Sequence, residues 1–407
     1  MPALLRPLRD PVYRRLFSAQ VIALTGTGLA TVALALLAFD LAGDDAGVVL
    51  GFALALKMVA YVTVSPVITA LARNVSRRRL LIGLDLGRAA LVLLIPFVDS
   101  VWQVFVLIFL LNACSAGFTP TFQAAIPDVI TDADTYTEAL SLSRLAYELE
   151  ALLSPALAAA LLGWVSYSAL FSINGVAFLA SAAIVALTAI PQPASVPDVG
   201  RLLRRIGAGI SSYLATPRLR ALLGLNLVVA AAGAMVIVNT VVYVKDSFGL
   251  SDSAVAWALA AAGAGSMAAA VLMPAVLRRT SERSIMLAGG ALLSAGLAAA
   301  TLISGYGGLV ACWLLLGVGL SMVQTPVGRL IRRSAPSEGR PALFAAQFSL
   351  SHLFWLVTYP VAGLAGQILG LGAAAGLLAL FAAVGVAFAA SAWPSEDAEE
   401  AVRAGQP

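Results

Sequence analysis

The chain has 407 residues, of which 60% are hydrophobic and only 11% are charged, and its mean hydropathy is +0.94. Soluble globular chains are about 45–50% apolar and about 25% charged, so this chain has too few polar side chains to cover a surface in water. The composition excludes an ordinary cytosolic enzyme, a secreted disulfide scaffold and a disordered protein. The net charge of +4 indicates basic membrane loops rather than a nucleic-acid partner.

Twelve apolar stretches are long enough to cross a bilayer, which takes roughly 20 residues. They cover residues 16–42, 46–72, 80–98, 101–125, 139–163, 167–190, 221–244, 252–277, 285–304, 307–331, 341–369 and 371–393. We therefore expect an all-α membrane protein with twelve transmembrane helices. The apolar run behind the basic N-terminus is too long for a cleavable signal peptide.

The connections divide the chain into a first six-helix bundle at 1–190, a linker at 191–220, a second six-helix bundle at 221–393 and a tail at 394–407. The linker carries three prolines and then Arg201, Arg204 and Arg205. This pattern predicts an amphipathic helix that lies on the bilayer surface instead of crossing it.

Basic residues fix the expected orientation. If the N-terminus is cytoplasmic, 21 of the 25 Lys and Arg residues fall on the cytoplasmic side, and only Lys245 falls outside. Positive charge is retained in cytoplasmic loops. We expect a multi-pass protein of the cell membrane with the N-terminus, the linker and the C-terminus in the cytoplasm.

The two halves repeat each other at an offset near 206 residues. Thr119-Pro120 matches Thr325-Pro326, and the pentapeptide at 141–145 (SLSRL) matches the one at 349–353 (SLSHL) at all but one position. Six spans is an even number, so both repeats enter the membrane from the same side. This predicts parallel repeats related by an axis along the membrane normal.

This organisation resembles the major facilitator superfamily. The opening run at 8–17 (LRDPVYRRLF) and the run at 125–128 (AIPD) resemble its twelve-span drug-efflux branch, the macrolide-efflux-like group. The resemblance implies a secondary active transporter that works by alternating access, and it favours proton-coupled export of small amphipathic or cationic compounds.

Two family signatures are altered in this chain. After the second span, residues 69–78 (TALARNVSRR) occupy a Gly-x-Leu-Ala-Asp-Arg-x-x-Arg-Arg pattern, and Arg73 replaces its aspartate. In the fifth span, the antiporter signature has a Gly-Pro-x-x-Gly-Gly run and another glycine four residues earlier. Glu150 stands at that earlier glycine and Ser154 stands before Pro155, so the packing glycines are changed.

Charged residues inside spans are costly and are therefore candidates for function. Glu148 and Glu150 lie near the middle of the fifth span and Lys57 near the middle of the second. Arg144 and Glu148 are an i,i+4 pair, whereas Glu150 is rotated about 200° from Glu148. We predict that Glu148 pairs with Arg144 and that Glu150 faces Lys57 as a proton-coupling pair. The alternative is a fixed ion pair that only joins the two spans.

Aromatic and polar side chains suggest a substrate cavity. His352, Trp355 and Tyr359 form a stripe on the eleventh span, and Tyr61 lies one turn from Lys57; such rings suit a cationic or amphipathic ligand. The other candidates are Gln20, Thr27, Asn112, Asn239 and Gln324. Plain helix packing is the alternative for the stripe, and interhelical hydrogen bonds of about 0.6 kcal/mol are the alternative for the polar groups.

A cytoplasmic gate is predicted from Asp85, Arg88, Arg77 and Arg78 at the inner end of the third span. Interfacial snorkelling is the alternative for the arginines. The connection at 128–138 is acidic and has no basic residue, so it could receive arginines from neighbouring loops.

No enzyme or cofactor is expected. The chain has no Gly-x-x-x-x-Gly-Lys-Ser/Thr loop for ATP and no nucleophile–base constellation. Cys114, Cys312 and His352 are too few for a Cys/His metal site or a disulfide framework. The expected partners are a small-molecule substrate, protons and the lipid bilayer, with no nucleic acid, and the chain is expected to function as a monomer.

Three other functions remain open from the sequence. A metal-cation exporter similar to nickel-resistance members would need carboxylate ligands. A small-solute importer would have the same architecture. A channel or a non-transporting receptor belongs to a different class; channels usually assemble identical pore elements from several chains, and receptors usually carry a sizeable soluble domain.

Overall fold

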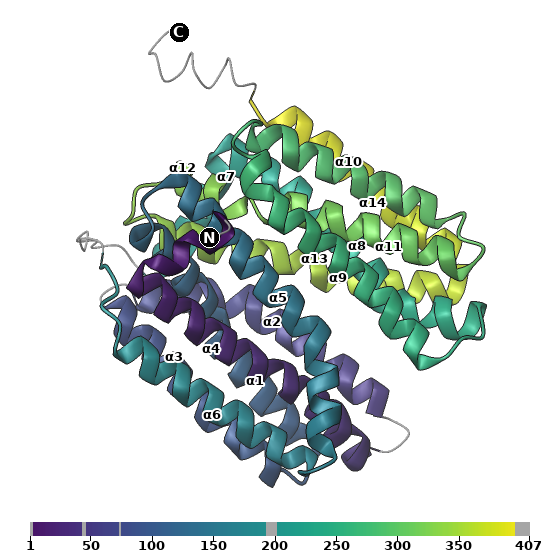
Figure 1. Ribbon diagram of the computed structural model, residues 1–407, viewed down its shortest axis with the longest axis horizontal. Coiled ribbons are helices and arrows are strands. Elements are labelled where there is room, and N and C mark those ends of the chain that lie inside the picture. Colours follow the sequence, from purple (N-terminus) through teal and green to yellow (C-terminus); the bar gives the residue numbers. More distant parts are fainter. Residues whose placement is uncertain (1–2, 43–45, 73–74, 193–201, 395–407) are drawn as a thin grey trace. The chain divides into compact units, whose positions relative to one another are not determined.

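A computed structural model describes residues 3–42, 46–72, 75–192 and 202–394, and every regular element in these ranges is helical. Figure 1 follows the elements in chain order. They are η1 (Ala3–Arg9), α1 (Pro11–Ala42), α2 (Ala46–Leu71), α3 (Arg77–Leu94) with η4 (Ile95–Phe97), α4 (Val101–Val129), α5 (Ala133–Leu162), α6 (Tyr167–Ala186), α7 (Leu202–Ala215), α8 (Pro217–Val241) with the π-helical η5 (Val242–Ser247), α9 (Asp252–Val276), α10 (Glu282–Ala300), α11 (Tyr306–Gln324), α12 (Val327–Ser334), α13 (Arg340–Leu369) and α14 (Leu371–Ala392).

The predicted all-α membrane fold is confirmed. Among the described residues, 10 helices are long and apolar enough to cross a membrane, and the bent α5 makes 11. The described apolar part of α2, Ala55–Leu71, is shorter, although α2 as a whole extends over 26 residues of the predicted span. The predicted span 307–331 contains a turn, because α11 ends at Gln324 and α12 begins at Val327. Pro326, which lacks a backbone N–H, stands at this turn.

The contacts group the chain into two compact units. Unit 1 is Met1–Gly209 with Ala335–Leu356, and unit 2 is Ile210–Ser334 with Val357–Pro407. This grouping differs from the division expected from the sequence repeat, since the first half of α13 belongs to unit 1. The two six-helix bundles at 1–190 and 221–393 remain a prediction, and the tail at 394–407 lies almost entirely outside the described residues.

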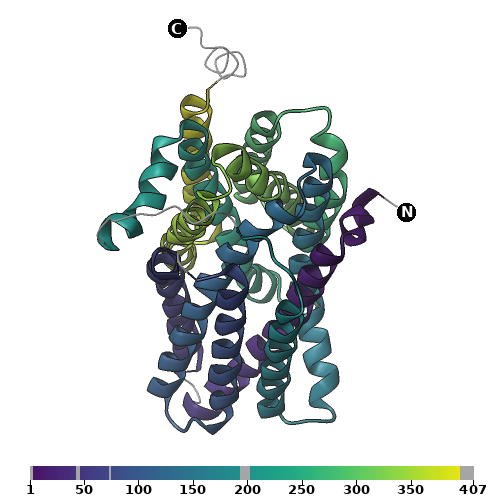
Figure 2. The same cartoon turned by 90° about the vertical axis from the view of Figure 1, so that its left-hand side faces the viewer.

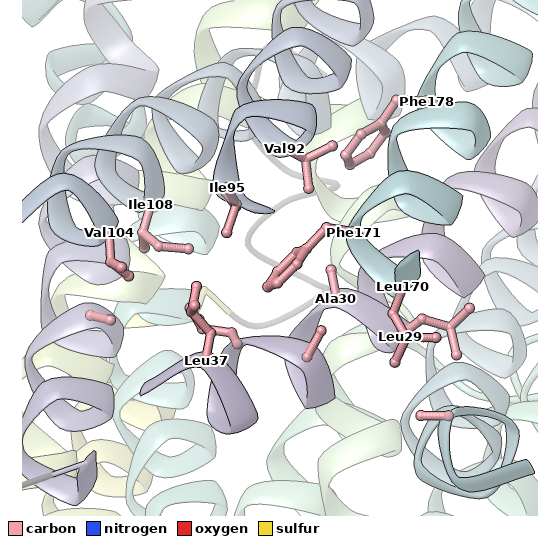
Figure 3. Close-up of a cluster of buried hydrophobic side chains, with 14 of the residues drawn as sticks. Leu29, Ala30, Leu37, Val92, Ile95, Val104, Ile108, Leu170, Phe171 and Phe178 are labelled. Carbon is pink, nitrogen blue, oxygen red and sulfur yellow. The ribbon is translucent and has the colours of Figure 1, made fainter. Parts of the chain in front are cut away.

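Unit 1 is built around four helices that share one apolar core. Helix α6 contacts α1 and α3, and α4 also contacts α1 and α3, in the purple-to-teal part of the chain (Figure 1 and Figure 2). Figure 3 shows Phe171 of α6 between side chains of α1, α3 and η4. The labelled core residues are Leu29, Ala30, Leu37, Val92, Ile95, Val104, Ile108, Leu170, Phe171 and Phe178.

Unit 2 is built around α8. Within the most apolar window of this span 78% of the residues are buried, whereas the figure is at most 44% for the other spans. Helices α9, α10, α11 and α14 contact α8. A helix that is apolar all round belongs at the centre of such a bundle, where it meets protein on every side.

The sequence repeat is visible where helices begin. Ser76 caps α3 by accepting a hydrogen bond from the Arg79 backbone N–H at 3.4 Å, and Ser281 caps α10 by accepting one from the Ser284 N–H at 3.2 Å. These serines occupy equivalent positions in the two repeats. Serine satisfies an N–H group that the first helical turn leaves without an intrahelical partner.

Within the linker, Leu202–Ala215 forms the helix α7, and its place on the bilayer surface stays a prediction. The side chains of the linker's three arginines lie outside the described residues, so the expected basic face is untested. Tyr213, near the end of α7, is fully buried and hydrogen-bonds with Asn226 of α8. Burial raises the pKa of the Tyr213 hydroxyl well above its usual value. The end of α7 is therefore anchored in unit 2 by a buried aromatic side chain.

The crossing of α9 and α11 depends on two glycines. A Cβ atom added to Gly317 would lie 1.9 Å from the Ala262 carbonyl oxygen, and one added to Gly265 would lie 2.0 Å from the Leu314 carbonyl oxygen. We expect Gly317→Ala to destabilise the protein by about 1–3 kcal/mol, because the added methyl meets backbone that cannot move alone. Thermal unfolding of the purified protein in detergent measures the effect.

Gly307→Ala in the same helix is the matched control, since a Cβ there meets nothing within 4 Å. Equal unfolding temperatures for the two variants would contradict this account of the crossing.

Candidate functional site

The charges of α5 lie inside unit 1. Arg144 and Glu148 form the ion pair that their i,i+4 spacing predicts, and both side chains are largely buried. Their contact satisfies two charges that would be costly to leave alone in a membrane span. Its functional role stays a prediction.

Glu150 and Lys57 are arranged differently. Glu150 accepts a hydrogen bond from Ser154 Oγ at 3.5 Å, and Lys57 on α2 interacts with its carboxylate electrostatically. However, no ion pair within 4.0 Å joins these two residues in the described part of the chain. Lys57 Nζ instead lies 5.7 Å from the centroid of the Tyr61 ring. The pair that the sequence suggested is therefore open in this structure.

An aromatic cluster adjoins Lys57. The Tyr61 ring lies 4.8 Å from the Phe348 ring and 4.8 Å from the His352 ring, and the Phe348 and His352 rings are 4.3 Å apart. His352 Nδ1 is 2.6 Å from the Phe348 carbonyl oxygen. Since a carbonyl only accepts, Nδ1 must donate the proton. The three rings therefore pack against one another, as the helix-packing alternative expects, and the Lys57 ammonium group lies beside the Tyr61 ring.

The contact between α2 and the first half of α13 is also polar. Ser65 Oγ donates a hydrogen bond to the Ala345 carbonyl at 3.5 Å, and Ser349 Oγ donates one to the Val62 carbonyl. The predicted stripe of α13 is divided between the units: His352 and Trp355 belong to unit 1, and Tyr359 belongs to unit 2.

The remaining predicted cavity residues have diverse surroundings. Gln20 is buried and accepts a hydrogen bond from Ser143 Oγ at 3.3 Å, which connects α1 to α5 close to the charged residues. The others bond to backbone: Thr27 donates to the Ala23 carbonyl at 2.9 Å, Asn112 to the Ile108 carbonyl at 2.8 Å and Asn239 to the Ala362 carbonyl at 3.2 Å. Gln324 is the last residue of α11.

The structure gives the four residues of the predicted gate separate partners, and their role as a gate stays a prediction. Asp85 pairs with Arg88 on the same helix and accepts a hydrogen bond from Ser181 Oγ at 2.8 Å. Arg78 donates to the Ala186 carbonyl. Asp85 is eight residues beyond Arg77, which is about 12 Å along a helix, so the two belong to different levels of the bundle.

The Arg88 guanidinium lies between two aromatic rings. Its Cζ is 4.0 Å from the Phe118 centroid and 4.4 Å from the Phe178 centroid. Asp85 is fully buried and Arg88 is 6% exposed. This ion pair therefore connects α3 with α4 and α6 in the interior of unit 1, where snorkelling to water does not occur.

Asp128, at the end of α4, receives the arginines that the acidic connection was expected to attract. Its two carboxylate oxygens accept from Arg77 Nη1 and Arg340 Nη1, each at 2.5 Å. These bonds connect the end of α4 with the first residues of α3 and α13 in unit 1. The sequence supplied the acidic run as a signal, but it did not identify Asp128 as the acceptor.

Unit 2 carries a cluster of opposite polarity. Glu282, the first residue of α10, pairs with Arg329 at 3.0 Å and with Arg333 at 2.5 Å, both on α12. In the repeat, Glu282 is close to the position equivalent to Arg77. The two halves thus place the acid and the base on opposite helices, which the match of sequence letters alone did not reveal.

In the described ranges, no group of three or more His, Cys, Asp or Glu residues could hold a metal ion.

The comparisons with known proteins agree with this architecture. The profile of the Major Facilitator Superfamily matches residues 16–243 and 222–407. The chain belongs to the Major Facilitator Superfamily. It is therefore a multi-pass membrane protein of a transporter family.

One curated relative is an uncharacterised transporter of this superfamily, YfiS of Bacillus subtilis strain 168. It is 26% identical over 400 residues, which cover 94% of this chain and 91% of the relative. The match extends over both repeats, and the name of this relative states no substrate.

Solved structures share the fold at low identity. The human organic anion transporter MFSD10 has a TM-score of 0.79 at 13% identity, with 93% of this chain and 98% of that chain covered. A bacterial homologue of the iron transporter ferroportin in an outward-facing state has a TM-score of 0.79 at 13% identity, with 94% of this chain and 99% of that chain covered. The Escherichia coli fucose:proton symporter FucP has a TM-score of 0.71 at 15% identity, with 94% of this chain and 98% of that chain covered. Such identities establish the fold alone.

The buried Asp85–Arg88 pair generates a stability prediction. Asp85→Asn leaves the Arg88 guanidinium buried without its carboxylate, and breaking such a pair costs roughly 3–5 kcal/mol. The double variant Asp85→Asn with Arg88→Met removes both charges, so it should unfold at a higher temperature than Asp85→Asn alone. Thermal unfolding in detergent measures both variants.

An Asp85→Asn protein that has the same unfolding temperature as the wild type but transports abnormally would instead support the gate role expected from the sequence.

Proposed function

We propose that this chain is a proton-coupled exporter of small amphipathic or cationic compounds, which works by alternating access in the cell membrane. In this proposal the termini are cytoplasmic, one chain is sufficient for transport, and Glu150 is the coupling group. Lys57 is the cation that competes for Glu150 with the proton and the substrate.

The observation that carries the proposal is the open Lys57–Glu150 pair. By contrast, Arg144 with Glu148 on α5 and Asp85 with Arg88 on α3 form closed ion pairs. A charged residue at the centre of a span costs about 2.5–3.5 kcal/mol on insertion scales. Two opposite charges that face each other without closing are therefore best explained by a water-accessible or ligand-accessible site.

The chemistry follows from the charge of one carboxyl group. When Glu150 is ionised, it attracts a cationic substrate or the Lys57 ammonium group. When it is protonated, that attraction is lost and the substrate is released. Because the proton and the cation compete for one carboxylate, binding of one from the outside favours departure of the other, as antiport requires.

The aromatic cluster supplies the apolar part of the proposed site. Tyr61 and His352 lie beside Lys57, and aromatic rings attract organic cations through their faces. Gln20, which reaches α5 from α1, adds a polar group that a substrate could hydrogen-bond. This combination favours ligands with a flat apolar body and a polar end.

The contacts of Asp128 supply a proposed cytoplasmic latch. Both of its carboxylate oxygens hold arginines from other helices, Arg77 and Arg340. Paired carboxylate–arginine bonds are directional and strong. We infer that these bonds must break when α13 moves during the transport cycle.

Transport in vesicles tests the coupling role. Purified protein in liposomes is given a proton gradient, and movement of ethidium or of another compound identified by growth protection in a transporter-deficient host is recorded. Glu150→Gln should abolish gradient-driven transport, because the amide cannot exchange a proton. Glu148→Gln is the matched control two residues away, and it should retain the response to the gradient, since its partner Arg144 belongs to a closed pair.

Gradient-driven transport that survives in Glu150→Gln would contradict the proposal. Protection of the host against divalent metals alone would favour the metal-exporter alternative, and gradient-driven uptake would favour the importer.

A further inference from the structure

We propose that Gly28 of α1 is a positioning residue that sets the place of the Glu150 carboxylate. The inference rests on the proposed role of Glu150 in transport, and the geometry that carries it is independent of the substrate.

The contact between α1 and α5 leaves no room for a side chain at residue 28. A Cβ atom built on Gly28 would lie 1.8 Å from Ser154 Oγ, 2.4 Å from Ser154 Cβ and 2.5 Å from Glu150 Oε1. Ser154 is only 4% exposed. The backbone of α1 therefore covers Glu150 and the hydroxyl that hydrogen-bonds to it.

The two glycines of this part of α1 face different helices. A Cβ on Gly26 would meet Ala177 Cβ and Asn174 Oδ1 of α6, each at 2.7 Å. Residues two apart on a helix are rotated by about 200°, so Gly26 and Gly28 lie on opposite faces. Gly26 therefore allows the packing of α1 on α6, whereas the atoms nearest to a Cβ on Gly28 belong to Ser154 and Glu150 of α5.

A methyl group at residue 28 would have to displace the carboxylate. Ser154 Oγ can rotate away, but this rotation breaks its 3.5 Å hydrogen bond to Glu150. Ser154 Cβ is fixed to the backbone, so relief of its 2.4 Å contact requires α5 to move away from α1. Either response changes the surroundings of Glu150.

Helix α5 has a bend at this level. Its segments Ala133–Ser154 and Ala156–Leu162 differ in direction by 43°. Pro155 stands between them and cannot donate a backbone hydrogen bond to residue 151. The Gly28 contact therefore lies where α5 changes direction, and it fixes the position of the last turn before the bend.

Labelling by a hydrophobic carbodiimide tests the inference without a substrate. The reagent modifies protonated carboxyl groups, and mass spectrometry of the protein in lipid nanodiscs gives the rate at Glu150, with Glu148 in the same peptide as reference. Gly28→Ala should raise the rate at Glu150 severalfold and shift the pH profile of this labelling. Gly26→Ala, the matched packing control, should leave both unchanged even if it lowers the unfolding temperature.

A double-variant cycle isolates the Ser154 contact. In a Ser154→Gly background the two closest atoms are absent and only the 2.5 Å approach to Glu150 Oε1 is left, so adding Gly28→Ala should change the labelling rate by a smaller factor than Gly28→Ala does alone. If the Gly28→Ala protein does not fold, adding Ser154→Gly should restore its folding. Adding Ser154→Gly to a Gly26→Ala protein that does not fold should restore nothing.

The inference is overturned if Gly28→Ala leaves labelling and the pH profile unchanged, if Gly26→Ala changes them equally, or if Ser154→Gly gives no rescue. If the labelling results hold while Glu150→Gln still transports with the gradient, Gly28 positions the carboxylate and the proposed coupling role fails.

Discussion

The free energy of a charge in hydrocarbon governs the arrangement of this protein. A lone charged side chain in a span costs several kcal/mol, and pairing with a second charge offsets that cost when the geometry is good. Arg144 with Glu148 and Asp85 with Arg88 meet this requirement within single helices, and the Asp85–Arg88 pair gains Ser181 and two aromatic rings. Lys57 and Glu150 approach each other without an ion pair, which is why the proposed transport chemistry is assigned to them.

Close helix crossings supply the rigid surroundings that such a site needs. Glycines let α9 and α11 approach backbone to backbone in unit 2, and they let α1 meet both α5 and α6 in unit 1. In a membrane, helix association depends on packing of this kind, because lipid tails are as apolar as the side chains and no hydrophobic driving force brings the helices together. A site carried by tightly crossed helices can change the environment of one carboxylate through a small movement.

The helical spans and the local pairs could be predicted because each depends on short stretches of sequence, whereas the orientation stays a prediction. The apolar run lengths gave the helices, and the i,i+4 spacing gave the Arg144–Glu148 pair. The Arg340–Asp128 bond joins residues 212 positions apart and depends on which helices are neighbours, so the acidic run at 128–138 predicted its kind but not its members. The 1.5 Å rise per residue of a helix separates Arg77 from Asp85 by about 12 Å, so their partners depend on neighbouring helices that the sequence does not specify.

The resemblance to family signatures located some unusual residues without explaining them. Glu150 stands where the family signature has a glycine, and in the structure Gly28 on the facing helix α1 leaves the space that the larger side chain needs. This complementarity could not be read from either segment alone. The substrate could not be predicted from the sequence either, since Gln20, Thr27 and Asn112 suit a substrate cavity and ordinary interhelical hydrogen bonds equally well.

The central claim is that water or a polar ligand reaches Lys57 and Glu150 within the membrane. Cysteine labelling tests it most directly. In a background without Cys114 and Cys312, Lys57→Cys or Glu150→Cys is introduced, and vesicles are treated with a membrane-impermeant thiol reagent. Leu149→Cys is the neighbouring reference, since that leucine is 44% exposed on the surface of α5. The account predicts labelling at residues 57 and 150 and protection at residue 149. Cysteines at 57 and 150 that react only with lipid-soluble reagents would contradict it.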